Sequence, residues 1–183
     1  PIAGRGRAIK HWPEVEQALI EAGVEFDVVA TAAPLEAVSL AEKAHAKYSA
    51  VIAVGGDGTV HEVVNGLLRA SNEGETLPLG VIPLGNGDDF AKVIPPETAI
   101  GSKVFEWRVA VEKIAKGETK LFDVGRLTNS SSDNDPQYFM NGMDIGFGAQ
   151  TALNFTTVPS FLTGMAAYLA AIMKTLIDYR IPK

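Results

Sequence analysis

The sequence has no cysteine and no excess of positive charge. Without cysteine, the chain of 183 residues can form neither a disulfide nor a thiolate metal site, which fits a cytoplasmic protein. Its 22 acidic residues outnumber its 16 Lys and Arg, and the net charge of −6 argues against a nucleic-acid binder, which would need a basic face. The uncharged part of the last predicted helix, residues 161–173, is too short to cross a bilayer.

One stretch organises the chain. Residues 51–54 form an apolar, β-branched run, which is typical of a strand buried on both faces of a parallel sheet. Gly55, Gly56 and Gly58 follow at once and predict a turn that another molecule can approach closely. The apolar positions of residues 60–68 then have helical spacing. A helix N-terminus beyond a strand presents unpaired N–H groups, so we expect it to bind phosphate.

Asp57 is out of place in a turn that binds phosphate alone, because its carboxylate would repel the ligand. A divalent cation removes this conflict, since Mg²⁺ is held by one or two carboxylates together with phosphate oxygens. The alternative is that Asp57 only stabilises the turn. Thr59 and Glu62 have the spacing of a capping box, and they can cap the helix, contact nucleotide, or do both.

The elements around this stretch predict a parallel sheet. We expect a helix from Pro13 to about Ala22 ended by Gly23, a strand over 24–31 and a helix over 35–47. A further strand over 79–84 leads into a second glycine turn, residues 85–91. Because ligands bind beyond the carboxyl ends of parallel strands, both turns are expected at the site.

After residue 96 the pattern changes, and we place a domain boundary there, at Pro95-Pro96. A helix over 101–116 is followed by two short strands, 120–128 and 137–141, which predict a hairpin and the start of an antiparallel β domain. In the last helix, over 161–178, a stripe of apolar residues is expected to pack on that domain or to contact acyl chains. The stripe comprises Phe161, Met165, Leu169, Ile172 and Leu176.

These motifs, in this order, resemble the catalytic domain of diacylglycerol kinases, a family that also includes sphingosine kinases and bacterial lipid kinases. The resemblance covers essentially the whole chain. It is carried by Gly55-Gly56-Asp57-Gly58-Thr59 with Glu62 and Asn65-Gly66, by Gly85-Asn86-Gly87-Asp88-Asp89-Phe90-Ala91, and by Asp123-Val124-Gly125-Arg126 with residues 139–149. It implies an α/β fold: a Rossmann-like parallel-sheet domain over 1–96, then a β-rich second domain with helices over 97–183.

The resemblance also implies a reaction. The expected function is ATP-dependent transfer of the γ-phosphoryl group to a lipid hydroxyl, most simply that of diacylglycerol, with ATP and Mg²⁺ as cofactors. The expected partners are ATP and a lipid acceptor, with peripheral contact to a membrane; a homodimer stays open. The family places its general base in an Asp-Gly-Glu segment, which this sequence lacks.

Residue roles follow from the same resemblance. Asp57 is the predicted catalytic residue and, with Asp89 and Asp123, forms a water-mediated Mg²⁺ network. The predicted nucleotide contacts are Gly4, Arg5, Gly55, Gly56, Gly58, Thr59, Glu62, Gly85, Asn86 and Gly87. Gly4 and Arg5 belong to a Gly/Arg-rich opening that includes Arg7 and is suited to phosphate.

Two departures from the family pattern keep alternatives open. Asn86 stands where Thr is usual, and Asp88 stands where Asn is usual, which adds a carboxylate beside the nucleotide. Asp88 or Asp89 can instead cap the next helix. The competing functions are a sphingosine or long-chain-base kinase, an NAD kinase, and a non-catalytic nucleotide or lipid sensor. Both ends suggest a truncated chain, which begins without Met and stops just after a helix.

Overall fold

The computed structural model describes residues 6–71, 75–94, 106–128, 136–159, 162 and 164–180. These residues form two compact units, divided between Asn141 and Gly142, and each is considered by itself. The boundary predicted at residue 96 lies outside the described residues. The hairpin that we expected to open a second domain belongs to the first unit, so the assignment of family domains to 1–96 and 97–183 stays a prediction.

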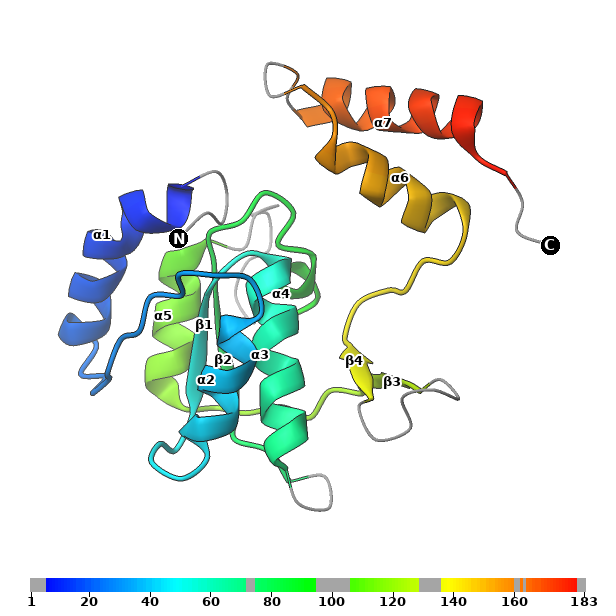
Figure 1. Cartoon of the computed structure of the whole chain (residues 1–183). Helices are drawn as coiled ribbons and strands as arrows, with labels where there is room; N and C mark the ends of the chain where they lie inside the picture. Colours follow the sequence, from blue (N-terminus) through cyan, green and yellow to red (C-terminus); the bar gives the residue numbers. More distant parts are fainter. Residues whose placement is uncertain are drawn as a thin grey trace. The chain divides into compact units, whose positions relative to one another are not determined.

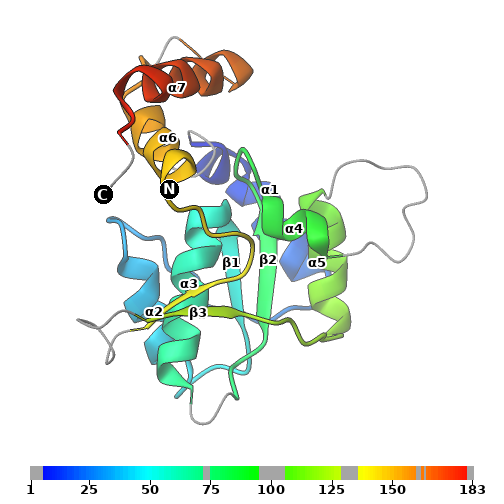
Figure 2. The same ribbon diagram turned by 90° about the vertical axis from the view of Figure 1, so that its right-hand side faces the viewer.

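The first unit is built on two parallel strands, β1 (Val51–Gly55) and β2 (Leu79–Pro83), which lie side by side in Figures 1 and 2. In register, Val51 is opposite Leu79 and Gly55 is opposite Pro83. Because both strands run the same way, their carboxyl ends meet at one edge. The mixed α/β architecture with a parallel sheet is therefore confirmed.

Helices cover both faces of the sheet (Figure 2). On one face, α2 (Glu36–Ala44) and α3 (Asp57–Ala70) enclose a core with Ala53 and Val81. On the other, α1 (Arg7–Glu21) and α5 (Trp107–Lys116) pack over Ile52, Val54 and Ile82. The alternation of strand side chains between two cores explains why β1 and β2 read as continuous apolar runs.

Two local expectations for the amino-terminal part are wrong. Helix α1 begins at Arg7, so Pro13 lies inside it and not in its first turn. Residues 24–31 form no strand and pair with none in the described part of the chain. Side chains hold this segment instead: Val24 and Phe26 pack beside α1, and Asp27 accepts hydrogen bonds from Lys47 and Tyr48.

Several predicted stops and pairings are confirmed. Gly23 ends α1 with φ +74°, where Gly23 N–H donates to Ile20 and Val24 N–H to Leu19, and Gly117 ends α5 with φ +67°. The hairpin is also present, since β3 (Gly125–Leu127) and β4 (Gln137–Phe139) are antiparallel. Gly125 fits there because any Cβ would enter the Phe139 ring.

The second unit consists of α6 (Phe147–Thr156) and α7 (Gly164–Asp178), packed side by side (Figure 1). Helix α6 was not predicted from the sequence. Of the apolar stripe predicted on α7, Met165, Leu169 and Leu176 are 72, 53 and 61% exposed and do not pack inward, while their contact with acyl chains stays a prediction. Ile172 is half-buried and Phe161 lies outside the described residues.

Small side chains on α7 explain why its larger apolar residues are exposed. Ala167, Ala171 and Thr175 are buried, and the Thr175 hydroxyl accepts a 2.9 Å hydrogen bond from the buried Asn154 amide of α6. The two helices thus meet through small and polar groups, and the larger apolar residues are left outside. None of the helices in the described ranges is both long and apolar enough to cross a membrane.

Candidate functional site

The first glycine turn leads directly from β1 into α3. Gly56 is the residue before the helix and Asp57 is its first residue, so the first N–H groups of α3 lie beyond the strand end. Gly55 is buried beneath Thr59, and a Cβ on Gly55 would come within 2.6 Å of the Thr59 hydroxyl. The predicted strand, glycine turn and helix N-terminus are therefore confirmed in place.

The second glycine turn lies directly beside the first. Leu84 N–H donates a 2.9 Å hydrogen bond to Gly55 C=O, which joins the two strand ends. A Cβ on Gly85 would come within 2.5 Å of the Gly56 Cα, so the two backbones approach as closely as only glycine allows. Asn86 and Gly87 are exposed above this junction.

Two predicted metal-binding carboxylates converge on Gly87. A Cβ built there would lie 2.9 Å from Asp57 Oδ2 and 3.6 Å from Asp89 Oδ2. The other oxygen of Asp57 accepts a 3.2 Å hydrogen bond from Phe90 N–H, which fixes the carboxylate towards the second turn. Because Mg²⁺ takes one or two carboxylates with waters and phosphate oxygens, this pair fits the predicted ion.

Asp123, the third predicted member, is exposed on the segment before β3. Its neighbours bring that segment to α4 (Asp89–Val93), since Phe122 makes an edge contact with Phe90, 5.5 Å between ring centroids. Across the described ranges, no three His, Asp or Glu side chains form a group that could hold a metal directly. The role expected for Asp123 was indirect, through water, and it stays a prediction.

Two cations balance the acidic side chains at the turns. Lys92 Nζ lies 2.7 Å from Asp89 Oδ1, and this hydrogen bond raises the pKa of Lys92. Burial raises the pKa of the Asp88 carboxyl, and the Asp57 charge acts in the same direction. The hydrogen bond from Gly85 and the charges of Arg7 and Lys92 oppose that rise in pKa.

Asp88 does not cap α4 through its side chain, although it stands at the N-cap position. Its backbone is left-handed, with φ +53°, and its Oδ1 accepts a 2.9 Å hydrogen bond from Gly85 N–H. Arg7, in the first turn of α1, also binds Gly85: its Nη1 donates a 3.0 Å hydrogen bond to Gly85 C=O. Gly4 and Arg5, the predicted contacts of the opening loop, lie outside the described residues.

The predicted capping box is wrong. Thr59 is already the third residue of α3, and the helix has no side-chain cap. Glu62 turns away from its own helix and accepts a hydrogen bond of 3.3 Å from Ala37 N–H, in the first turn of α2. The helix begins at Asp57, three residues earlier than a cap at Thr59 would place it, and this removes the geometry that a capping box needs.

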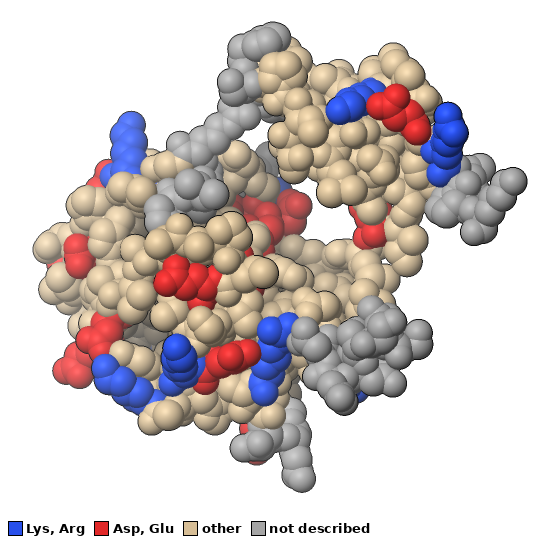
Figure 3. Space-filling view, viewed as in Figure 1, with Lys and Arg blue, Asp and Glu red and all other residues tan. Residues whose placement is uncertain are grey.

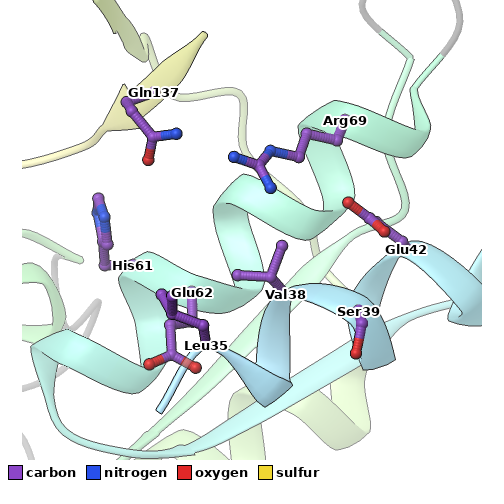
Figure 4. A pocket seen from close by; sticks show the side chains of 8 residues that line it. All are labelled: Leu35, Val38, Ser39, Glu42, His61, Glu62, Arg69 and Gln137. Carbon is purple, nitrogen blue, oxygen red and sulfur yellow. The ribbon is translucent and has the colours of Figure 1, made fainter. Parts of the chain in front are cut away.

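Glu62 also borders a separate hollow of about 420 Å³ between α2, α3 and the start of β4 (Figure 4). Its lining residues are Leu35, Val38, Ser39, Glu42, His61, Glu62, Arg69 and Gln137. The glycines of both turns and the Asp57 carboxylate are not among them. Glu62 is thus the one predicted nucleotide contact that lines this hollow, and its contact with nucleotide stays a prediction.

The sequence missed the role of Asn65. Its side chain is only 2% exposed and pairs with β4 as a neighbouring strand would: Nδ2 donates to Tyr138 C=O and Oδ1 accepts from Tyr138 N–H, both at 2.9 Å. The next residue, Gly66, lies where a Cβ would collide with the Val38 carbonyl oxygen of α2. The pair Asn65-Gly66 therefore joins α3 to its neighbours.

On the face drawn in Figure 3, acidic and basic side chains of the described residues are interspersed. The carboxylates of Asp57 and Asp89 gather beside Gly87, at the two glycine turns. They lie where the carboxyl ends of β1 and β2 meet, together with the N-terminus of α3. That combination suits a phosphorylated ligand carried with a divalent cation.

Comparisons with known proteins agree with this geometry. The model of the family "Diacylglycerol kinase catalytic domain" matches residues 1–127, which include both turns and Asp123. A diacylglycerol kinase of Bacillus subtilis (strain 168) is 34% identical over 175 residues, which are 95% of this chain and 52% of the relative. Diacylglycerol kinases of Staphylococcus aureus strains RF122 and MRSA252 are each 32% identical over 177 residues, 95% of this chain and 49% of theirs.

The chain thus spans about half the length of the curated relatives it matches. The matched region contains the parallel strands, the two glycine turns and the first carboxylates of the site. On this evidence the chain belongs to the diacylglycerol kinase catalytic domain family.

Proposed function

We propose that the protein is a Mg²⁺-dependent lipid kinase that transfers the γ-phosphoryl group of ATP to the hydroxyl of a diacylglycerol. The observation that carries this proposal is the convergence of the Asp57 and Asp89 carboxylates on Gly87, between two glycine turns. The names of the relatives support the lipid acceptor. Neither ATP dependence nor the acceptor follows from the fold alone.

The proposed roles divide between backbone and carboxylates. Gly55, Gly56, Gly58, Thr59 and the N-terminus of α3 would bind phosphate, with Gly85, Asn86 and Gly87 closing the site from the second turn. Asp57 and Asp89 would hold Mg²⁺, and Asp123 would act through water. Phosphoryl transfer depends mainly on positioning and on neutralising the phosphate charge, which is what these groups supply.

The acceptor would reach the site from a membrane surface. The second unit exposes large apolar side chains on α7, including Met165, Tyr168, Met173, Leu176 and Ile177. An exposed face of this kind is expected to meet lipid or another apolar surface. We therefore include peripheral membrane contact in the proposal. A homodimer stays a prediction that no contact in the structure supports.

The test uses the full-length protein with γ-labelled ATP, Mg²⁺ and a total lipid extract, and a parallel reaction with NAD. Thin-layer chromatography separates the products. We expect label in a lipid that migrates as phosphatidic acid. Label in a phosphorylated long-chain base would contradict diacylglycerol as acceptor, and label in NAD alone would contradict a lipid kinase. ATP binding without transfer would indicate the non-catalytic sensor.

Asp57→Asn tests the carboxylate most directly. Asparagine keeps an oxygen for Phe90 N–H but removes the charge that would hold Mg²⁺, so transfer should fall at least about 100-fold. Glu118→Gln removes one charge at an exposed position and is the matched control, expected to retain activity. Unchanged activity of Asp57→Asn would remove this residue from the mechanism.

A further inference from the structure

Two charged residues, which no comparison assigns to the site, bind the N–H and the C=O of Gly85. Asp88 Oδ1 accepts from the N–H at 2.9 Å, and Arg7 Nη1 donates to the C=O at 3.0 Å. Arg7 is 78 residues away in sequence and belongs to the first turn of α1. A single backbone residue thus connects α1 to the second glycine turn.

Gly85 is also the point where the two turns touch. It is buried, and its Cα side meets Gly56, the residue that precedes α3. A displacement of Gly85 would therefore move the second turn relative to the N-terminus of α3. Phosphate recognition by backbone N–H groups depends on their relative positions. Residues that fix the position of Gly85 therefore influence phosphate binding at the proposed site.

Asp88, which stands where the family pattern has Asn, can keep the hydrogen bond with Gly85 N–H. Where the family pattern has Asn, the Oδ1 atom of Asp88 supplies the same kind of acceptor, and the backbone is in the left-handed region that Asn and Asp tolerate best. The difference is one negative charge, half-buried beside Asp57. Arg7, fixed on the opposite side of Gly85, supplies an opposing positive charge.

We propose that Arg7 and Asp88 are paired positioning residues, which clamp Gly85 against Gly56 and together set the affinity of the site for Mg·ATP. The inference rests on the proposed function for its ligand, and on the two hydrogen bonds for its geometry. Asp88 contributes an acceptor and an unfavourable charge, while Arg7 contributes a donor and the charge that offsets it. The effects of changing the two residues are therefore coupled.

The variants separate acceptor from charge. Asp88→Asn keeps Oδ1 and removes the charge, so the dissociation constant for Mg·ATP should fall by about two- to fivefold, the range of a partly exposed charge interaction. Asp88→Ala removes both and should weaken binding. Arg7→Gln should also weaken binding, and Asp88→Asn should restore much of the loss in the double variant. Glu118→Gln and Lys116→Gln, both exposed, control for charge.

The measurements are isothermal titration with Mg·ATP and amide hydrogen exchange at Gly85. Asp88→Ala should speed Gly85 exchange, whereas Asp88→Asn should leave it protected; equal exchange in both would overturn the clamp. Additive effects of Arg7→Gln and Asp88→Asn on affinity would overturn the coupling. Absence of ATP binding by the unmodified chain would overturn the proposed function and the affinity role, whereas Gly85 exchange would still support or overturn the clamp.

Discussion

Several single side chains form hydrogen bonds with residues of other helices, strands or turns. Asp57 begins α3 yet accepts from Phe90 at the start of α4, and Arg7 begins α1 yet donates to Gly85 after β2. Asn65 is the most buried case, with its amide inserted against β4. The contacts of Asp57 and Arg7 cross between elements because the carboxyl ends of β1 and β2 bring these segments together, whereas Asn65 joins the middle of α3 to β4.

Asn65→Ala should destabilise the first unit by about 2 to 3 kcal/mol, because both half-buried backbone groups of Tyr138 lose the buried amide that pairs with them. Urea unfolding followed by tryptophan fluorescence measures this effect. Both tryptophans, Trp12 and Trp107, pack in the core between α1, α5 and the sheet, so the signal reports on this unit. Gln17→Ala, on an exposed amide, should cost less than about 0.5 kcal/mol. Equal losses in both variants would contradict the role of Asn65.

Residue roles of this kind could be predicted only in part. Asp57 stood out because a carboxylate in a phosphate-binding turn conflicts with its ligand unless a cation is present. Asp89 was predicted from the resemblance to the family motif, and the structure brings the two carboxylates to one place. The bonds of Arg7 and Asn65 depend on partners 78 and 73 residues away. No local sequence pattern predicts such distant contacts. Once the structure is known, the charge of Arg7 and the burial of Asn65 are consistent with them.

At the scale of elements, the order of strand, turn and helix determines where the site lies, and close packing determines how near the helices lie to one another. Helix α3 contacts α2 across Gly66, where even a methyl group would meet the Val38 carbonyl oxygen and lie 2.7 Å from the Ala41 Cβ. At Gly58, on the exposed start of the same helix, nothing lies within 4 Å of a Cβ. The two glycines of one helix therefore have opposite packing requirements.

This contrast gives a matched pair. Gly66→Ala should destabilise the protein by about 1 to 3 kcal/mol, since α2 must shift to admit the methyl group. Gly58→Ala should be neutral or stabilise it by up to about 1 kcal/mol, because alanine is the better helix former. Urea unfolding again reports both values. Stabilisation by Gly66→Ala would show that α2 does not lie as close to α3 as described.

Elements with strong periodicity or clear stop signals were predictable. The β1 run, the α3 face and the glycine ends of α1 and α5 all appear as expected. Residues 24–31 were not, because Val24 and Phe26 pack beside α1 while Val28 and Val29 are exposed, and the segment has no strand partner in the described ranges. Helix α6 was missed because the resemblance assigned residues 139–149, which include its start, to the opening of the β-rich domain.

At the scale of the whole chain, the family assignment and the geometry point to the same edge of the sheet. The family match covers residues 1–127, and the two turns lie within it, in the first compact unit. The hollow beside α2 and β4 belongs to that unit as well, and it is a competing place for a ligand. The central claim is therefore a claim about where Mg·ATP binds.

Titration of the ¹⁵N-labelled chain with Mg·ATP, followed by amide chemical shifts, tests this claim most directly. We predict that Gly56, Gly58, Gly85 and Gly87 shift together, that Mg²⁺ is needed for the full effect, and that Asp57→Asn abolishes it. Glu118→Gln should give the unmodified pattern. Shifts confined to the hollow, at Ser39 and Gln137, with the glycine turns unchanged would contradict the account, and so would the absence of any response to Mg·ATP.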